Sequence, residues 1–508
     1  MNDSVTGRNK IILVQPSMGV AGEFVRHPPL SLLYVASGLV REGFDVRIID
    51  LRASDGGAAE VVKALGDDVL WVGLTVMGGA PVSSALEVSR AVKAAGMYPV
   101  VWGGSLATIA PDTVLGNSAV DYAISGSGVS SAVRLSRALV ANDTPTSDEL
   151  DHVPGLYSRH EGRIVGRKPF RGFEPVPFRE IPYHLIPDYG VYAHFGTARR
   201  VFPIYSAFGC PYRCAFCISP AMYKEYKPKW LPLPATEVVD HIEYLRDRFD
   251  AGLIYFYDDD SFVNPEHIRG VLDELKRRRI KIPMSFRGAR VNEILRMDDE
   301  FLSALAESGT EILHVGLESG SPRILALYEK GVTVEDTIEA NRRLAKNGKL
   351  IAAYNWIVGT PGETCEEMAA TRRLLLRILD ENPRAFVFQP NKFHPIPGTV
   401  MADVAARHGY RPPATLEAWS CEEQEGDKRE PWYTPRIQRD IEMMQVTSYF
   451  IDHKAELLTT ENSLYYIIVR LIIALYRPFA RFRFERGFAG LLFEYPLFRR
   501  VVMRHRKG

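Results

Sequence analysis

Three cysteines, Cys210, Cys214 and Cys217, constrain this chain more than any other feature. They form the spacing C-x3-C-x2-C within the run Phe208-Gly-Cys-Pro-Tyr-Arg-Cys-Ala-Phe-Cys-Ile. Cysteine thiolates are the usual ligands of [4Fe–4S] clusters, and three of them leave one iron of the cube open to a substrate or cofactor. A structural zinc site would need a fourth Cys or His at short spacing, and the nearest candidate, His194, lies well upstream. The motif therefore predicts a cluster, with a zinc site or chance clustering as the alternatives.

An aromatic residue, Phe216, directly precedes the third cysteine, and Gly-Cys-Pro surrounds the first. In these features the chain resembles the radical S-adenosylmethionine (SAM) enzymes. The resemblance implies that the open iron chelates the amino and carboxylate groups of SAM. One electron then breaks the sulfonium bond to give a 5′-deoxyadenosyl radical. It also implies an external electron donor such as a flavodoxin or ferredoxin.

The charge balance and the length limit what else the protein does. Lys plus Arg (62) equals Asp plus Glu (62), so a basic field over the whole protein is absent and we expect no nucleic-acid partner. The 508 residues suggest about three domains.

The distribution of cysteines and the length of the apolar runs indicate the cellular compartment of the protein. Three of the five cysteines fall within eight residues, which is not how a disulfide framework is distributed. Cys365 and Cys421 stand alone, and we expect them to be ordinary thiols. The N-terminus has no apolar signal-peptide core, and the run 464–476 is too short to span a bilayer. The sequence predicts a cytoplasmic protein.

The N-terminal third alternates β-branched runs with amphipathic helical stretches. The predicted strands cover residues 11–15, 46–50, 70–75, 100–102 and 122–125, and the predicted helices cover residues 30–42, 58–65, 83–95 and 129–142. This alternation predicts an α/β domain with a doubly wound parallel sheet of flavodoxin-like or Rossmann type.

Small residues follow three of these strands. They form the runs Thr75-Val-Met-Gly-Gly, Gly103-Gly-Ser-Leu-Ala and Ser125-Gly-Ser-Gly. Ligands of such sheets bind outside the carboxyl ends of the strands, and glycines let a large flat ligand approach the backbone. The dinucleotide pattern G-x-G-x-x-G does not follow the first strand, which argues against NAD.

The order of these runs resembles the cobalamin-binding domain that precedes many radical SAM domains. The resemblance implies cobalamin contacts from Thr75, Met77, Gly78, Gly103, Gly104, Ser125, Gly126 and Gly128. The motif D-x-H-x-x-G is absent, which implies cobalamin bound base-off without a histidine ligand. Relatives usually have G-x-G-E in the last loop, where this chain has Val129. A degenerate domain kept for packing is the alternative.

Residues 146–198 contain many prolines and no long periodic segment. Such a passage favours an extended connector over the surface. We therefore predict a cobalamin-binding-like domain at 1–145, a Pro-rich linker at 146–198, a radical SAM domain at 199–400 and a helical C-terminal region at 401–508.

The central region alternates helices and strands again. The predicted helix–strand pairs are 235–249 with 253–257, 267–278 with 283–287, 299–308 with 312–317, 334–347 with 351–358 and 365–379 with 385–389. With the strand before Cys210 this makes six βα units, which is typical of an open (β/α)6 partial barrel. Chemistry in parallel barrels lies at the carboxyl ends of the strands.

Polar residues stand at these strand ends, where each alone would favour turn chemistry or a helix cap. By resemblance, Tyr255-Phe-Tyr-Asp-Asp-Asp receives the SAM amino group, Gly316-Leu-Glu-Ser-Gly-Ser holds the ribose and carboxylate, and the strand ending in Gly359-Thr-Pro-Gly-Glu lies beside adenine. The implied SAM-binding residues are Phe216, Tyr257, Asp259, Arg290, Glu318, Ser319, Gly359 and Gln389.

The C-terminal region is predicted to be helical with a basic aromatic tail. From Arg470 to the end there are ten Lys or Arg against two Glu, interleaved with phenylalanines. This composition favours either a helical cap whose aromatics pack on the barrel or an amphipathic segment that contacts a membrane surface.

These features together predict a cobalamin-dependent radical SAM methyltransferase. Its substrate would be a small molecule, a secondary metabolite or lipid methylated on an unactivated carbon or phosphorus. The runs Val76-Met-Gly-Gly and Val101-Trp-Gly-Gly also resemble the anaerobic magnesium-protoporphyrin ester cyclases, so a cyclase or rearrangement enzyme is the first alternative. A non-catalytic sensor or electron-transfer protein is the second.

Overall fold

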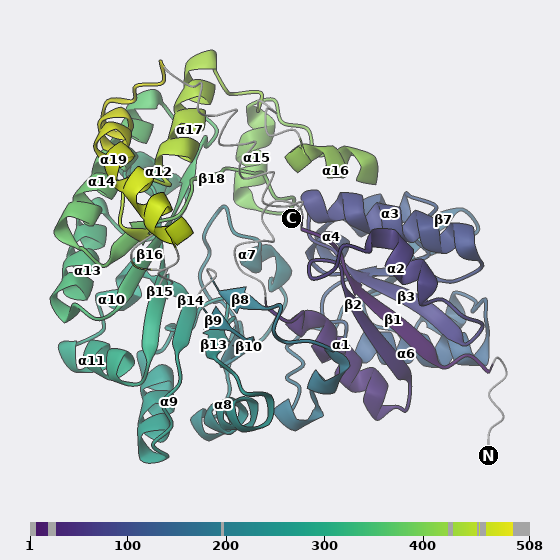
Figure 1. Ribbon diagram of the computed structural model, residues 1–508. Coiled ribbons are helices and arrows are strands. Elements are labelled where there is room, and N and C mark those ends of the chain that lie inside the picture. The colour runs from purple at the N-terminus through teal and green to yellow at the C-terminus, as the bar shows by residue number, and fades with distance from the viewer. Residues whose placement is uncertain are drawn as a thin grey trace. The chain divides into compact units, whose positions relative to one another are not determined.

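The computed structural model describes residues 7–18, 27–194, 198–424, 430–454, 457 and 464–490. The chain forms two compact units, and each is described by itself. The first consists of Met1–Tyr192, Met222–Pro228 and Pro412–Lys428. The second consists of Ala193–Ala221, Lys229–Arg411 and Arg429–Gly508. Figure 1 shows their helices and strands.

The first unit is built on one seven-stranded sheet of order β2-β1-β3-β4-β5-β6-β7. Its parallel strands are β1 (Lys10–Gln15), β2 (Asp45–Asp50), β3 (Val69–Thr75), β4 (Val100–Gly103) and β5 (Tyr122–Ile124). Strands β1 and β3 are apolar and buried along nearly their whole length, as expected of a parallel sheet covered on both faces. The predicted doubly wound sheet is confirmed.

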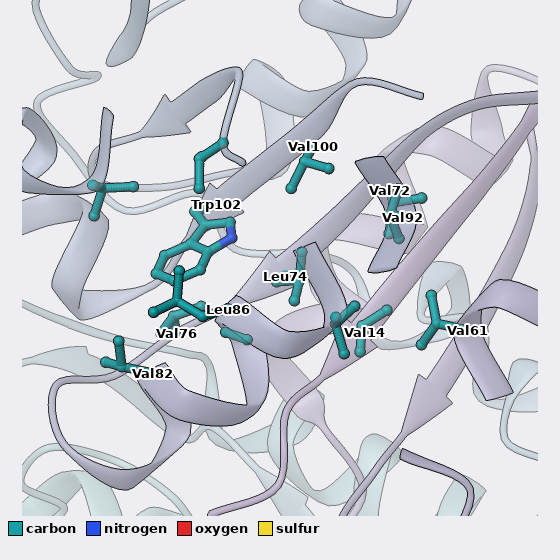
Figure 2. Packing of buried hydrophobic residues seen from close by; sticks show 14 of the residues in the cluster. Val14, Val61, Val72, Leu74, Val76, Val82, Leu86, Val92, Val100 and Trp102 are labelled. Carbon is teal, nitrogen blue, oxygen red and sulfur yellow. The ribbon is translucent and has the colours of Figure 1, made fainter. Parts of the chain in front are cut away.

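Helices cover both faces of this sheet (Figure 1). On one face α1 (Leu30–Arg41) packs with α6 (Val129–Ala141), and on the other α2 (Gly57–Lys63) packs with α3 (Ala80–Ala95). Figure 2 shows the core under α2 and α3, where the indole of Trp102 lies among valines and leucines. Its Nε1 donates a hydrogen bond to the buried hydroxyl of Ser89 at 2.9 Å. Two short helices, α4 (Ser105–Ile109) and α5 (Pro111–Leu115), follow β4.

Part of the predicted extended connector is instead a hairpin. Strands β6 (Leu156–His160) and β7 (Arg163–Gly166) are antiparallel and extend the sheet at β5. The two turn residues, Glu161 and Gly162, both have positive φ (49° and 76°), which is the conformation of a two-residue hairpin turn. The domain boundaries themselves stay a prediction.

The second unit is an open parallel sheet whose six main strands follow chain order. They are β10 (Val201–Ile204), β13 (Leu253–Phe256), β14 (Met284–Arg290), β15 (Thr310–Glu318), β16 (Ile351–Val358) and β17 (Ala385–Val387). The helices between them are α8 (Ala235–Phe249), α9 (Pro265–Arg277), α11 (Asp299–Glu307), α13 (Val334–Asn347) and α14 (Cys365–Glu381). The predicted partial barrel of six βα units is confirmed.

Shorter elements complete this unit. A hairpin of β11 (Ala207–Gly209) and β12 (Trp230–Pro232) encloses the cysteine segment together with α7 (Ser219–Met222). Other short elements are β8 (Ala193–His194), β9 (Ala198–Arg199), α10 (Val291–Ile294), α12 (Pro322–Leu327) and β18 (Asn391–Lys392).

The C-terminal region is helical, as predicted, but it is divided between the two units. Helix α16 (Leu416–Gln424) packs against α3 in the first unit. In the second unit lie α15 (Val400–Arg407), α17 (Pro435–Thr447) and α19 (Leu464–Arg486), and α19 packs against α14 and α17. Among the described residues, no helix has the length and apolar character needed to cross a membrane. Residues 491–508 of the predicted basic tail lie outside the described residues.

Candidate functional site

The three cysteines occupy a loop that its backbone holds in place. Cys214 is buried, and Cys210 and Cys217 are half-buried. The Cys217 amide donates to the Cys214 carbonyl at 3.0 Å, and the Ala215 amide donates to the Tyr328 carbonyl at 2.9 Å. The loop is thereby fastened to the segment that follows α12.

The thiols of this loop suit an iron–sulfur cluster. Burial raises the pKa of Cys210 and of Cys217, and charge on a second cysteine raises each further. Within the described ranges no three His, Cys, Asp or Glu side chains are grouped to hold one metal ion. In a cube each thiolate binds its own iron, so the three need not converge on one point. Three soft sulfur ligands on one loop, with a guanidinium beside one of them, fit this group.

That guanidinium belongs to Arg290, the last residue of β14. Its Nη1 donates to Cys214 Sγ at 2.9 Å, and its Nη2 donates to the Lys330 carbonyl. The carbon between these nitrogens lies 3.9 Å from the centre of the Tyr212 ring. Arg290 therefore places a positive charge beside the cysteine loop.

Two buried carboxyl groups lie under the same loop. Glu293 is fully buried, and it accepts hydrogen bonds from the Tyr212 hydroxyl (2.8 Å) and the Arg290 amide (3.1 Å). Burial and then charge on Glu293 raise the pKa of Asp260 well above its usual value. Two close carboxyl groups cannot both ionise at low cost. Burial and the neighbouring Glu293 therefore favour the neutral form of Asp260.

The three aspartates after β13 differ in what they contact. Asp258 is fully buried and accepts from the amides of Ser206 (2.7 Å) and Ala207 (3.1 Å). Burial raises its pKa to about 6. Its contacts hold the turn from β10 to β11, which leads into the cysteine loop. Asp259 is exposed, and it is the aspartate of this run that the sequence assigned to SAM.

Glu318 ends β15 in an unusual backbone conformation. It is a non-glycine residue with φ of 63°, and its Oε1 accepts from Lys330 Nζ at 2.7 Å with both side chains buried. A Cβ on Gly316 would lie 2.5 Å from Glu318 Oε1 and 2.7 Å from Lys330 Nζ, so a side chain there would displace the ends of this pair. Cys214, Arg290, Lys330 and Glu318 thus form one continuous chain of contacts.

Two further predicted residues lie beside this chain. The Phe216 ring packs edge-on against Tyr328 at 4.8 Å, and Lys330 Nζ lies 6.0 Å from its centre. Ser319 is fully buried, its hydroxyl lies 3.2 Å from Thr371 Oγ1 and it accepts from the Ser321 amide. The structure therefore directs Phe216 toward the chain of contacts and Ser319 toward α14.

Gly359 follows β16 with φ of 76°. Its amide donates to Glu363 Oε2 at 2.8 Å, its carbonyl accepts from Trp432 Nε1 at 2.8 Å, and a Cβ there would lie 2.2 Å from the Tyr433 hydroxyl. The segment before α17 therefore packs directly on this loop. Gln389, beyond β17, donates its side-chain amide to the Gln445 carbonyl of α17 at 3.1 Å.

In the first unit the predicted small residues also gather at one edge of the sheet. Gly104 has φ of 90°, and a Cβ there would lie 2.8 Å from both the nitrogen and the oxygen of Val76. At Gly103 the nearest atom to a Cβ would be the Leu74 oxygen, at 4.0 Å. Gly104 is therefore fixed by the fold, whereas Gly103 presents bare backbone. Thr75 and Gly103 pair across β3 and β4.

The third loop is tied to the second. The Gly126 amide donates to Thr108 Oγ1 at 3.0 Å, and that hydroxyl donates to the Gly104 carbonyl at 2.9 Å. The Ser125 amide donates to the Gly155 carbonyl at 2.8 Å. Gly128 begins the segment that enters α6 and faces Val35.

At the other end of this edge, Met77 is 47% exposed and Gly78 faces the indole of Trp419 from α16. Bare backbone between ordered loops fits a broad flat ligand such as a corrinoid.

Two family models match the chain. Residues 204–375 match the model described as the radical SAM superfamily, and residues 23–136 match the model described as the B12 binding domain. The chain belongs to the cobalamin-binding radical SAM enzymes. Its cofactors are a [4Fe–4S] cluster, SAM and cobalamin, and the non-catalytic alternative is set aside.

Three curated relatives are similar in sequence to this radical SAM enzyme over most of its length. An uncharacterized methyltransferase of Pyrococcus horikoshii is 29% identical and covers 78% of this chain and 83% of its own. The anaerobic magnesium-protoporphyrin IX monomethyl ester cyclase of Rubrivivax gelatinosus is 24% identical, covering 72% and 65%. The hopanoid C-3 methylase of Methylococcus capsulatus is 25% identical, covering 73% and 68%.

Two solved structures share the fold. The cobalamin-dependent SAM radical enzyme OxsB matches with a TM-score of 0.69 at 16% identity, covering 94% of this chain and 72% of that one. The radical SAM methyltransferase TsrM from Kitasatospora setae matches with a TM-score of 0.60 at 22% identity, covering 79% and 76%.

Sequence reasoning missed Lys330, Glu293 and Tyr212, which the structure brings to the cysteine loop. Tyr212 stands inside the cysteine motif and was available as a signal. Lys330 lies between the end of α12 and the start of α13, and no pattern in the sequence marks it.

Proposed function

We propose that this enzyme is a cobalamin-dependent radical SAM methyltransferase. It acts on an unactivated carbon or phosphorus of a small molecule, in the class of secondary metabolites or lipids. When bound, SAM with the cluster would supply the radical chemistry and cobalamin would supply the methyl-transfer chemistry. The protein binds, orients and shields them.

One observation carries the proposal: the chain contains two parallel sheets, and each has an edge suited to binding a ligand. The barrel has an unbroken chain of contacts from Cys214 through Arg290 and Lys330 to Glu318. The first sheet keeps bare backbone at Gly103 between ordered loops. A chain that needed SAM cleavage alone would not need the second edge. The names of two relatives, a methyltransferase and a methylase, support methyl transfer.

In this proposal each edge holds its own cofactor. Cys210, Cys214 and Cys217 bind the cluster, and Arg290 balances their charge. Glu318 is a buried carboxylate that ribose hydroxyls can satisfy, and Lys330 holds it in place at 2.7 Å. Phe216, Tyr257, Asp259, Gly359 and Gln389 complete the SAM site, whereas the Ser319 hydroxyl acts within the fold.

The first edge would hold cobalamin in the same way. Thr75, Met77, Gly78, Gly103, Gly104, Ser125, Gly126 and Gly128 would be the residues that contact the corrinoid. Each assignment follows from position at the carboxyl ends of the strands.

An anaerobic assay of the reconstituted protein tests the proposal. SAM, a reductant and hydroxocobalamin are supplied with candidate substrates, and 5′-deoxyadenosine, S-adenosylhomocysteine and bound corrinoid are followed together. We expect both nucleosides and about one bound corrinoid per chain. The variant in which the three cysteines are replaced by alanine should give neither nucleoside. An intact cluster that yields neither nucleoside with any candidate substrate would sink the proposal.

A cyclase or rearrangement enzyme is the second candidate, because the relative from Rubrivivax gelatinosus carries that name. It would produce deoxyadenosine without S-adenosylhomocysteine and without a methylated product. The same assay therefore separates the two.

We also propose an external electron donor, such as a flavodoxin or ferredoxin, and contact with an anionic membrane surface. The second rests on α19, whose outward face carries Ile467, Leu471, Leu475, Phe479 and Phe482, all exposed. These five residues, the α19 stripe, recur at steps of three or four and so lie along one side of the helix. Arg470, Arg477 and Arg481 belong to the same helix, and a basic helix with such a stripe favours anionic lipid.

Vesicle flotation tests this contact. The protein should bind phosphatidylglycerol-containing vesicles and not pure phosphatidylcholine, and L475E with F482E should abolish binding. The control M97E changes an exposed methionine of the first unit and should leave binding intact. If L475E with F482E bound as wild type does, the stripe would be excluded. Self-association that the same variant abolishes would instead make the stripe a contact between copies.

A further inference from the structure

Arg287 stands on the inner face of the barrel sheet. Its neighbour Phe286 stacks on Phe256 at 4.2 Å and packs against Phe262, which in turn contacts Phe301 of α11. Phe286 therefore faces the helices. Successive side chains of a strand point to opposite faces, so Arg287 faces away from the helices, toward the inside of the barrel.

The guanidinium of Arg287 lies on an aromatic ring. Its central carbon is 4.6 Å from the centre of the Tyr257 ring. Tyr257, Tyr255 and Asp259 act on the pKa of Arg287, which is raised overall although burial alone would lower it. Tyr257 and Asp259 are themselves predicted SAM-site residues, so Arg287 belongs to the same part of the barrel.

Arg287 differs from the other arginines of this region in its partners. Arg290 donates to Cys214 Sγ and to a carbonyl, and Arg278 contacts three carboxylates. Within the described part of the chain, Arg287 donates no hydrogen bond and has no carboxylate oxygen within 4.0 Å. Its side chain lies within the barrel yet keeps surface that a ligand can reach.

A stacked guanidinium keeps its edges available. Its five N–H donors lie in one plane and match a carboxylate or phosphate in a two-pronged contact. We propose that Arg287 binds an anionic group, a carboxylate or a phosphate, of the substrate. This inference rests on the proposed function, because it places the substrate in the barrel.

The position suits the substrate better than SAM. If SAM chelates the cluster through its amino and carboxylate groups, as the resemblance implies, its charges would lie at the cysteine loop near Arg290 and Lys330. Arg287 lies three residues before Arg290, about 10 Å back along the strand. An anion held there would lie beyond the cofactor's carboxylate.

Calorimetric titration of the full, cluster-loaded chain tests the inference. With SAM and hydroxocobalamin already bound, methyl phosphate and glutarate serve as the two anionic probes and glutaramide serves as the neutral one. At least one anion should bind wild type, the neutral amide should not, and R287Q should weaken the anion at least tenfold. R287K should keep part of the affinity because it keeps the charge and loses the planar fork.

The matched control is R248Q, which changes an exposed arginine of α8 and should bind the anion as wild type does. Melting temperatures of the apoproteins verify that R287Q and R287K are folded. The preferred probe identifies the substrate group as phosphate or carboxylate.

Three results would overturn the inference. The first is that neither anion binds wild type at tens of millimolar. The second is that R287Q binds the anion as tightly as wild type does. The third is that R287Q weakens SAM or corrinoid by the same tenfold factor, which would assign Arg287 to a cofactor. The titration measures binding and does not depend on turnover. A failure of the methyl-transfer assay is therefore distinguishable from a failure of this inference.

Discussion

Arg290 Nη1 lies 2.9 Å from Cys214 Sγ, and the same guanidinium donates to the Lys330 carbonyl. One side chain thus joins the cysteine loop to the residue that holds Glu318. The contact links the cluster ligands to the region assigned to the ribose, which lie more than a hundred residues apart in the sequence.

Replacing Arg290 should separate cluster assembly from SAM cleavage. In R290M the three cysteines remain, so iron and sulfide contents should stay near wild type. Loss of a buried charge-assisted hydrogen bond costs roughly 1.5–3 kcal/mol, so deoxyadenosine formation should fall roughly 10- to 100-fold. R248M is the control, and wild-type cleavage by R290M would contradict the prediction.

The buried pair of Glu318 and Lys330 should show strong coupling. In K330M the carboxylate stays buried without its cation, which costs roughly 3–5 kcal/mol, whereas removal of both charges costs much less. In the set E318L, K330M and E318L/K330M, the double variant should therefore melt at a higher temperature than K330M, although all three variants should bind SAM weakly. Melting curves and SAM titrations check this. Additive losses of stability would show that the two charges are independent.

Gly316 gives a second test of the same pair. G316A would place a methyl group 2.5 Å from Glu318 Oε1, so it should lower both stability and SAM affinity. The control G270A lies in α9, where a Cβ would make an ordinary contact with Ala235 at 3.4 Å. That substitution should be neutral or slightly stabilising, because alanine favours a helix. Equal melting temperatures for G316A and G270A would be the contrary result.

Two adjacent glycines should separate folding from corrinoid binding. G104A introduces a Cβ 2.8 Å from backbone atoms of Val76 at a φ of 90°, so it should lower the melting temperature of the apoprotein. G103A points into free space and should leave that temperature unchanged while it weakens hydroxocobalamin binding several-fold. Thermal melting and corrinoid absorbance measure the two effects. If G103A bound corrinoid normally, this edge would not contact the ring.

The alternation of strands and helices was predictable because each parallel strand here is a nearly continuous apolar run, as in β3. The hairpin of β6 and β7 was not, because its strands are short and edge-exposed and prolines dominate the surrounding sequence. Its Glu161-Gly162 turn was the available signal.

The site was predictable where chemistry depends on local spacing, as with Cys210, Cys214 and Cys217. It was not predictable where the partner comes from a distant loop. Lys330 reaches Glu318 from the segment after α12. Glu318 has a left-handed backbone conformation, and the ends of both side chains pack against Gly316. Likewise, Trp419 reaches Gly78 from more than three hundred residues away, so nothing local marks it as part of the first unit.

Glu363 should make stability depend on pH. Its Oε2 accepts from the amides of Gly359 and Thr360, and its Oε1 has no hydrogen-bond partner among the described residues. Burial raises the pKa of Glu363 from 4.5 to about 7. Between these values the folded state binds more protons than the unfolded state. Stability from this group is therefore present below about pH 4.5 and is lost as pH rises toward 7.

The expected loss is up to about 3 kcal/mol across that range. In E363Q this pH dependence should disappear, so the difference in melting temperature between wild type and E363Q should shrink or change sign from pH 4.5 to 7. The control E300Q removes an exposed carboxyl at the start of α11, and its melting curve should run parallel to that of wild type. Parallel curves for E363Q and wild type would show that Glu363 is already ionised at acid pH. The Glu363 carboxyl in the loop after β16 would then carry no proton at that pH.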